Sequence, residues 1–230
     1  MSGKVREISN ELIDEIKQAV ADADKVLIGI GTEWMADGKA SDLMNGYQIS
    51  DDDKDKILTG YKEIKSLIKD KDYYIMSLCY DDLIYEIFDD EDNVVTPCGG
   101  YRLLQCGQHI MTKDEVKLID GKPSCPLCGG DLSFNNIENE QYMEEGYLVK
   151  FGEYKAWLQS TINKKLVIIE LGANMQFPSV IRFAFDRLCQ YNLKSTFYRV
   201  NESLYQHAAE SEERGISIKG KSLSLFNDMK

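Results

Sequence analysis

The chain has 230 residues, enough for one large domain or for one domain that carries an inserted lobe. Its formal net charge of -12 gives a surface that repels nucleic-acid phosphates and anionic membranes. No stretch approaches the roughly 20 apolar residues that span a bilayer, and the start of the chain lacks the apolar run of a signal peptide. We therefore expect a cytoplasmic globular protein that binds neither nucleic acid nor membrane.

Helices and strands are predicted to alternate along most of the chain. In chain order they are a helix over Leu12–Val20, a strand at Lys25–Gly31, a helix over 51–70, a strand at Tyr73–Ser77, a helix over 147–161, a strand at Leu166–Gly172, a helix with Pro178 in its first turn, and a strand at Ser195–Val200. This alternation predicts an α/β fold, a Rossmann-like and mostly parallel sheet with helices on both faces.

Residues 96–146 lose this periodicity and contain four of the six cysteines. In a reducing compartment, crowded thiols indicate metal binding or reactivity rather than disulfides. We expect residues 1–95 and 147–230 to form the Rossmann-like domain, and residues 96–146 to form a small inserted zinc-binding lobe.

Two residue pairs with the same spacing predict the metal site. Cys125 and Cys128 form a CxxC knuckle, and Cys106 and His109 repeat the two-residue gap upstream. Tetrahedral zinc takes four such donors, and a site with four protein ligands is structural because no coordination position stays open. Cys98 is the alternative to His109 as the fourth ligand, and the paired spacing favours His109. A redox CxxC or unrelated buried thiols are the competing interpretations.

Ligands of parallel sheets bind at the carboxyl ends of the strands. In this sequence those ends carry glycines and polar side chains: Gly29 to Glu33, Ser77 to Asp81, Gly172 to Asn174, and Asn201. Glycine turns let backbone N–H groups approach a diphosphate, although simple tight turns would use the same residues. Asp81 is also well placed to cap a helix that begins at Leu83.

Taken in order, these pieces resemble the sirtuins over residues 25–205. Gly29-Ile-Gly31 is similar to the sirtuin glycine loop, and Ser77-Leu-Cys-Tyr-Asp81 to the Thr-Gln-Asn-x-Asp segment. Gly172-Ala-Asn-Met175 is similar to the late Gly-Thr-Ser-Leu, and Asn201 to the asparagine that contacts adenosine. A closer likeness is to the macrodomain-linked, class M sirtuins, through Cys98-Gly-Gly-Tyr-Arg-Leu-Leu-Gln-Cys106 and Glu170-Leu-Gly172 with Pro178.

The resemblance implies NAD as cosubstrate, zinc as a structural metal, and a protein as substrate or acceptor. Class M proteins with known chemistry use NAD for protein ADP-ribosylation rather than for lysine deacylation. The implied catalytic residues are Asp81, facing the nicotinamide carboxamide, and Cys98. The implied NAD-binding residues are Gly29, Gly31, Glu33, Ser77, Asp81, Gly172, Ala173, Asn174 and Asn201.

Several positions depart from the sirtuin pattern. Cys98 stands where deacylases have their catalytic histidine, and an ordinary thiol is mostly protonated at neutral pH. Cys98 is therefore an inert small residue, a reactive thiolate or a zinc ligand.

Two other segments also depart from the pattern. Glu33 replaces the serine of the glycine loop, where it would repel phosphates or bind a ribose hydroxyl or a cation. Leu78 and Cys79 replace the Gln and the Asn of the Thr-Gln-Asn-x-Asp segment. We predict ADP-ribosyl transfer, with lysine deacylation or a weakly catalytic NAD- or ADP-ribose-binding module as alternatives.

Overall fold

A seven-stranded parallel sheet forms the centre of the computed structural model, which describes residues 5–89 and 92–227. The strand order is β1-β14-β13-β12-β2-β5-β6, and every neighbouring pair is parallel. The strands are β1 (Arg6–Glu7), β2 (Lys25–Ile30), β5 (Asp72–Ser77), β6 (Val94–Val95), β12 (Leu166–Leu171), β13 (Ser195–Asn201) and β14 (Gly215–Lys219). The predicted α/β fold is confirmed.

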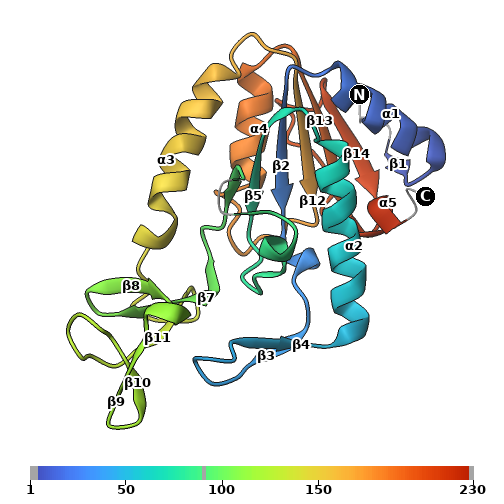
Figure 1. Ribbon diagram of the computed structural model, residues 1–230. Helices are drawn as coiled ribbons and strands as arrows, with labels where there is room; N and C mark the ends of the chain where they lie inside the picture. Colours follow the sequence, from blue (N-terminus) through green and yellow to red (C-terminus); the bar gives the residue numbers. More distant parts are fainter. Residues whose placement is uncertain (1–4, 90–91, 228–230) are drawn as a thin grey trace.

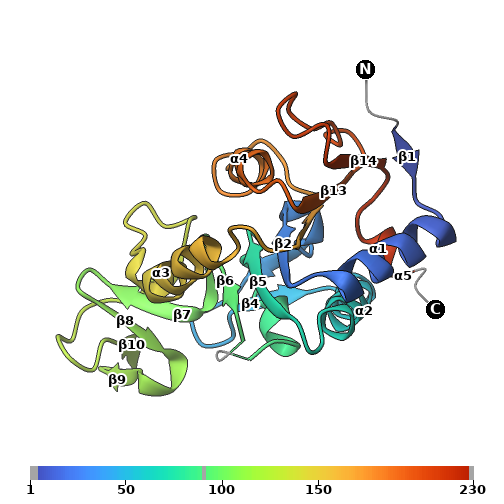
Figure 2. The same cartoon turned by 90° about the horizontal axis from the view of Figure 1, so that it is seen from above.

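Helices cover both faces of this sheet (Figure 2). On one face lie α1 (Asn10–Asp22), α2 (Asp51–Leu67) and the short α5 (Ser224–Asn227); on the other lie α3 (Glu145–Ser160) and α4 (Arg182–Tyr191). Ser9 caps α1, because its hydroxyl accepts the backbone N–H of Leu12 at 3.3 Å. The predicted inner face of α1 is buried, as the helical spacing requires.

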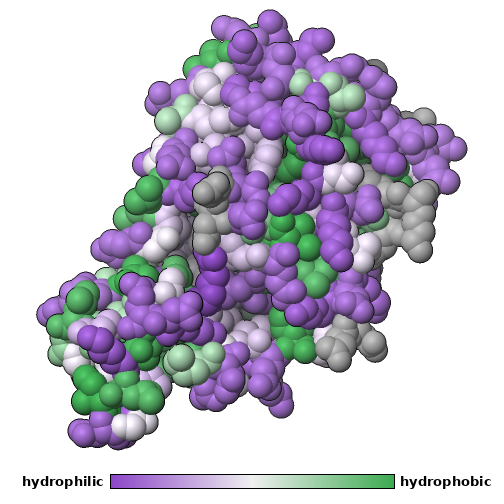
Figure 3. All heavy atoms as spheres, viewed as in Figure 1, coloured by the Kyte–Doolittle hydropathy of each residue, from purple (hydrophilic) through white to green (hydrophobic). Residues whose placement is uncertain are grey.

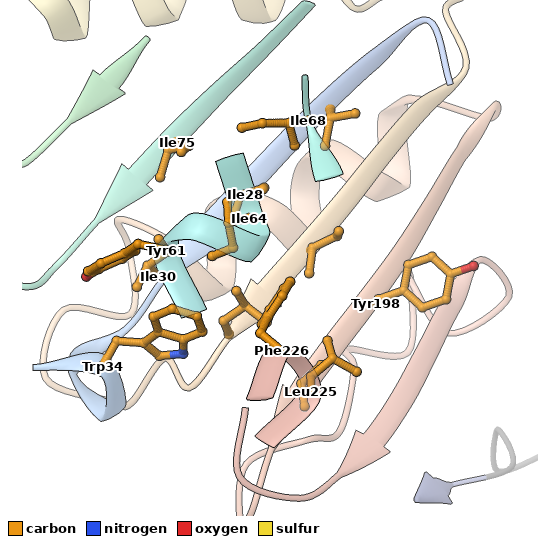
Figure 4. Close-up of a cluster of buried hydrophobic side chains, with 14 of the residues drawn as sticks. Ile28, Ile30, Trp34, Tyr61, Ile64, Ile68, Ile75, Tyr198, Leu225 and Phe226 are labelled. Atoms are coloured by element: carbon orange, nitrogen blue, oxygen red, sulfur yellow. The ribbon is translucent and has the colours of Figure 1, made fainter. Parts of the chain in front are cut away.

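The core is divided between the two faces of the sheet. The strands β2 and β12 are buried at all six of their positions, which explains why both read as continuous apolar runs. On the α2 face, Trp34 packs against Tyr61 and Phe226 with ring centroids 5.2 and 5.6 Å apart (Figure 4). This packing fixes the loop after β2 against α2 and the C-terminal segment.

The helix after β12 begins later than the sequence predicts. Pro178 is the first residue of a turn, and α4 begins only at Arg182. The backbone N–H of Phe183 donates to the Pro178 carbonyl at 2.8 Å, so Pro178 belongs to the turn that leads into the helix. The predicted inward residues Ile181 and Phe185 are fully buried.

Two insertions lie at the carboxyl ends of the strands (Figure 1). The first is a hairpin of β3 (Gly38–Ala40) and β4 (Tyr47–Ile49) between β2 and α2. The second is the lobe, whose antiparallel sheet has the order β11-β7-β8. The strands of the lobe are β7 (Gly99–Cys106), β8 (His109–Thr112), β9 (Lys117–Ile119), β10 (Lys122–Ser124) and β11 (Ser133–Asn136). Short 3-10 helices η1 (Thr32–Trp34), η2 (Leu83–Glu86) and η3 (Lys113–Glu115) complete the connections.

Among the described residues, no helix combines the length and the apolar character needed to cross a membrane.

Candidate functional site

The lobe brings together one cluster of metal-ligating side chains: Cys106, His109, Cys125 and Cys128. One ligand atom from each lies within 4.8 Å of all the others. The Cys106 Sγ is 3.5 Å from the His109 Nδ1 and 3.6 Å from the Cys128 Sγ, and the Cys125 Sγ is 3.7 Å from the same His109 nitrogen. A tetrahedron with metal–sulfur bonds of about 2.3 Å has edges of about 3.8 Å, so the donor set is consistent with a zinc site.

Local backbone structure explains this convergence. Cys106 and His109 flank the turn between β7 and β8, and they are paired across the ladder. Cys125 and Cys128 form the second turn, where the Gly129 N–H donates to the Cys125 carbonyl at 2.9 Å. The knuckle reaches the surface at Leu127, which is 72% exposed. Exposed apolar side chains gather at the lobe end of the molecule (Figure 3).

Two glycine turns meet at the strand-end edge of the sheet. A Cβ on Gly31 would overlap the Gly172 carbonyl and the backbone of Ala173. Gly172 has a φ of +62°, a left-handed conformation that favours glycine. The loops after β2 and β12 therefore touch each other through backbone, which requires glycine at both positions.

Glu33 lies between these loops and the C-terminal segment. Its Oε1 accepts the backbone N–H of Ser222 at 2.7 Å, and a Cβ on Gly172 would lie 2.5 Å from its Oε2. Partial burial raises the pKa of Glu33, against the lowering effect of the Ser222 hydrogen bonds. The Ser222 N–H beside Gly172 is thus occupied by a carboxylate of this same chain.

Asp81 is buried and accepts two backbone N–H groups. Its Oδ2 accepts from Ala36 at 2.7 Å and its Oδ1 from Leu83 at 3.1 Å. Desolvation raises the pKa of Asp81, while these two hydrogen bonds act in the opposite direction. The contact with Leu83 resembles the helix-capping role that the sequence allows, and the contact with Ala36 ties down the loop after β2. Each carboxylate oxygen keeps a second lone pair for a ligand donor.

The remaining polar side chains of the edge are also bound within the protein. The Asn201 amide donates to the Ala173 carbonyl at 3.0 Å and accepts the backbone N–H groups of Ser203 and Leu204 at 3.0 and 2.8 Å. Asn174 donates to the Thr32 hydroxyl at 2.6 Å. The fully buried Ser77 hydroxyl accepts the Cys79 N–H at 3.2 Å. The structure therefore brings these predicted residues to one edge, with their hydrogen bonds satisfied.

Gly29 and Cys98 have surroundings that differ from the rest of the predicted site. Gly29 lies inside β2, where a Cβ would come within 2.5 Å of Phe185 and 2.8 Å of Ile181. The structure gives it a packing role beneath α4. Cys98 is 3% exposed in the apolar cluster on the α3–α4 face, and burial raises the pKa of its thiol to about 12. Of its three possible roles, the inert small residue fits best, since the thiol stays protonated and lies outside the metal cluster.

Asp82 is a residue that sequence reasoning missed. It adopts a left-handed φ of +66°, and its Oδ2 accepts the backbone N–H groups of Tyr101 and Arg102, both at 2.6 Å. Gly100 makes this approach possible, because a Cβ there would overlap the Asp82 carboxylate. Burial raises the pKa of Asp82 to about 6. Asp82 thus joins the sheet edge to the lobe. Its left-handed turn could not be recognised from the sequence.

A buried charge network also escaped prediction. Glu170 is fully buried and accepts from Arg182 at 2.9 Å and from Arg199 at 2.8 Å. Arg199 also pairs with Asp186 at 3.1 Å. Arg182 donates further to the Leu204 carbonyl at 2.8 Å. The network fixes the loops after β12 and β13, and a glutamate inside an apolar strand run was the available signal for it.

A cleft of about 470 Å³ lies where the hairpin, the lobe and the sheet edge meet. Its lining includes Asp81, Asp82, Arg102 and the stacked rings of Tyr47 and Tyr101, whose centroids are 4.6 Å apart. A groove of about 580 Å³ lies at the opposite end of the sheet, where Asp24, Lys165 and Lys194 are found and no predicted site residue lies.

Solved structures with a similar fold are Sir2 homologues. One is a Sir2 homologue in complex with NAD, with a TM-score of 0.58 and 10% identity, covering 99% of this chain and 95% of that one. Another is a mutant Sir2 homologue in complex with ADP-ribose, with a TM-score of 0.57 and 13% identity, covering 96% and 94%. The protein has the Sir2 fold, a Rossmann-like sheet with an inserted small lobe.

Sequence comparison adds a distant relationship within that fold. No protein-family model matches the chain. A protein ADP-ribosyltransferase of Staphylococcus aureus is 24% identical over 176 residues, 69% of this chain and 56% of that protein. A probable bifunctional ADP-ribose hydrolase/ADP-ribosyltransferase of Fusarium oxysporum f. sp. cubense is 27% identical over 120 residues, 43% of this chain and 20% of that protein. The chain is thus a distant homologue of sirtuin-type ADP-ribosyltransferases, and it matches about half or less of their length.

Proposed function

We propose that the protein binds NAD at the strand-end edge and transfers its ADP-ribose to an acceptor protein. The observation that carries this proposal is the state of Cys98. A buried, protonated thiol occupies the position where the resemblance places the deacylase histidine. A thiol with a pKa near 12 is a poor general base at neutral pH, which disfavours deacylation relative to ADP-ribosyl transfer. The homology to protein ADP-ribosyltransferases supports the same choice.

NAD, when bound, supplies the ADP-ribosyl group and nicotinamide as its leaving group. In this proposal the turns at Gly31 and Gly172 approach the diphosphate, and Asn174 and Asn201 lie at the adenosine half. Asp81 accepts from the nicotinamide carboxamide with the lone pairs that Ala36 and Leu83 leave open. The Ala36 contact also holds the loop after β2 over the site, which restricts the entry of water.

The Cys106, His109, Cys125 and Cys128 cluster binds a structural zinc ion in this proposal. Four protein ligands close the coordination shell, so the metal supports the lobe and takes no part in the reaction. The lobe (residues 96–146) then acts as a rigid wall of the cleft, joined to the domain formed by residues 1–95 and 147–230 through Asp82.

Labelled NAD tests the proposed reaction. The expected result is release of nicotinamide and transfer of label to an acceptor protein, reduced about 100-fold or more in Asp81→Asn. Asp114→Asn, an exposed change on the lobe, is the matched control and should keep full activity. Hydrolysis of an acyl-lysine peptide at a rate above that of label transfer would favour the deacylase instead.

A binding module without turnover is the second candidate. This candidate is favoured by the hydrogen bonds that Glu33, Asn174 and Asn201 make within the protein, because these side chains are then less available to bind a ligand. In that case NAD or ADP-ribose raises the melting temperature and no nicotinamide is released. At a ligand concentration of about 100 times Kd, the expected stabilisation is roughly 2.7 kcal/mol.

A further inference from the structure

The position that Glu33 occupies has the features of an anion site. The Ser222 N–H points into it and meets the Glu33 carboxylate at 2.7 Å. Gly172, with its φ of +62°, offers backbone without a side chain on the other side. The Lys221 ammonium also acts favourably on a negative charge there. Phosphate groups at strand ends are bound by this combination of a backbone N–H donor, a glycine without a side chain and a nearby cation.

The donor of this site is fixed independently of Glu33. Ser222 is fully buried, and its hydroxyl accepts the indole N–H of Trp34 at 2.8 Å. Trp34 in turn packs against Phe226 and Tyr61. The Ser222 N–H therefore keeps its position when the carboxylate leaves, and would then need another acceptor.

The carboxylate itself is not fixed in the same way. Glu33 is an exposed residue as a whole, although its carboxylate is partly desolvated where it meets Ser222. Its side chain can therefore move out into solvent. The negative charge of Glu202 also acts against the ionised form of Glu33. A like charge nearby and partial loss of solvent make this contact a weak one for stability.

We propose that the Glu33 carboxylate is an internal occupant of an anion site, which the diphosphate of NAD must displace in order to bind. This inference rests on the proposed function and adds a regulatory element to the same site. Glu33 then determines the affinity for the nucleotide by competing for the Ser222 N–H. Removing the carboxylate strengthens binding of an anion, whereas loss of a Glu33 that held a ribose hydroxyl would weaken binding of NAD.

Inorganic pyrophosphate is the direct probe, because it tests the anion site without the rest of NAD. Its dissociation constant is measured by calorimetry for the wild type, Glu33→Ala, Glu33→Gln and Glu202→Gln. We expect binding to Glu33→Ala to be about tenfold tighter than to the wild type, since a charge-assisted competitor has gone. Glu33→Gln should lie between the two, because its amide fills the position without a charge. Glu202→Gln removes a neighbouring charge but no contact, and should change the constant less than about threefold.

Equal or weaker binding of pyrophosphate by both Glu33 variants would overturn the proposal. Thermal unfolding of each variant without ligand shows that the fold is retained, and Glu33→Gln serves where Glu33→Ala is unstable. NAD is then titrated into the same proteins. Tighter pyrophosphate binding with no NAD binding in any variant would refute the proposed function and leave the anion site standing. Tighter binding of both ligands by Glu33→Ala supports the two together.

Discussion

The metal cluster and the strand-end edge differ in what their polar side chains contact. In the lobe, the ligand atoms of three thiols and one imidazole lie within 4.8 Å of one another, with three of the pairs at 3.5 to 3.7 Å. At the edge, Asp81, Asn174 and Asn201 each hydrogen-bond to other parts of the protein. In the proposed function a metal completes the lobe, because the cysteine and histidine donors contact mainly one another. A nucleotide bound at the edge as we propose exchanges places with hydrogen bonds that the edge already makes, so its binding energy is a difference between two sets of hydrogen bonds.

The largest expected effect is loss of the metal. Cys125→Ser removes one of four ligands, and structural zinc contributes about 10 kcal/mol or more to the folding of small domains. We expect zinc content to fall from one per chain to near zero and the lobe to unfold, as seen by elemental analysis and by hydrogen exchange of β7 to β11. Cys189→Ser changes a buried cysteine of α4 that is not part of the metal cluster, and it is the control. Full zinc content in Cys125→Ser would contradict the four-ligand assignment.

A second effect tests how much the buried charge network around Glu170 stabilises the loops at the strand-end edge. Glu170→Ala leaves Arg182 and Arg199 buried without their shared carboxylate, a change that costs about 3 to 5 kcal/mol. Urea unfolding measures it. The control is Glu153→Ala, which breaks an exposed pair with Lys150 at 3.5 Å and should cost less than about 1 kcal/mol. Similar losses in the two variants would show that the buried network does not hold the loops.

A third effect concerns the junction between the two regions. Because the pKa of Asp82 is about 6 in the folded protein, above its unfolded value, the protonated acid adds stability that is complete below about pH 4 and lost as the pH rises through 6. Relative to Asp82→Asn, the wild type should thus gain about 2 kcal/mol between pH 7 and pH 4. Urea unfolding at several pH values checks this. Parallel pH profiles for the two proteins would mean that Asp82 titrates normally.

The smallest effect concerns Cys98. Truncation in Cys98→Ala should cost about 1 kcal/mol and leave the zinc content unchanged, since the thiol packs in an apolar cluster away from the metal. In the native wild type, iodoacetamide at pH 7.5 should leave Cys98 unmodified, because its thiol has a pKa of about 12. Rapid alkylation of Cys98 before unfolding, seen by mass spectrometry, would restore the thiolate interpretation.

The parts of the molecule that could be predicted are those fixed by local sequence. The apolar runs of β2 and β12 and the face of α1 follow from burial and helical spacing alone. The metal cluster follows from two turns whose spacing imposes the geometry. The strands β1, β6 and β14 escaped prediction, because they are short or lie toward the edges of the sheet and carry little periodicity.

The parts that could not be predicted depend on contacts between distant residues. Gly29 reads as part of a nucleotide loop, but the reason for a glycine there is the close approach of Phe185 from α4. The contact of Glu33 with Ser222 joins residues at opposite ends of the chain. The Asp82 contacts need a left-handed turn and a bare Gly100 at once. Such contacts arise from the topology of the fold, and no regular spacing of residues in the sequence predicts them.

The indole of Trp34 makes the edge of the sheet visible to fluorescence. Its N–H is bonded to the Ser222 hydroxyl, and the N–H of the same serine is bonded to Glu33. The other tryptophan, Trp157, lies beside Lys25 and Asp72 at the far end of the sheet. In a Trp157→Phe background, all indole emission therefore comes from one buried ring, two hydrogen bonds away from the carboxylate. Its wavelength and lifetime provide a label-free record of when that carboxylate moves.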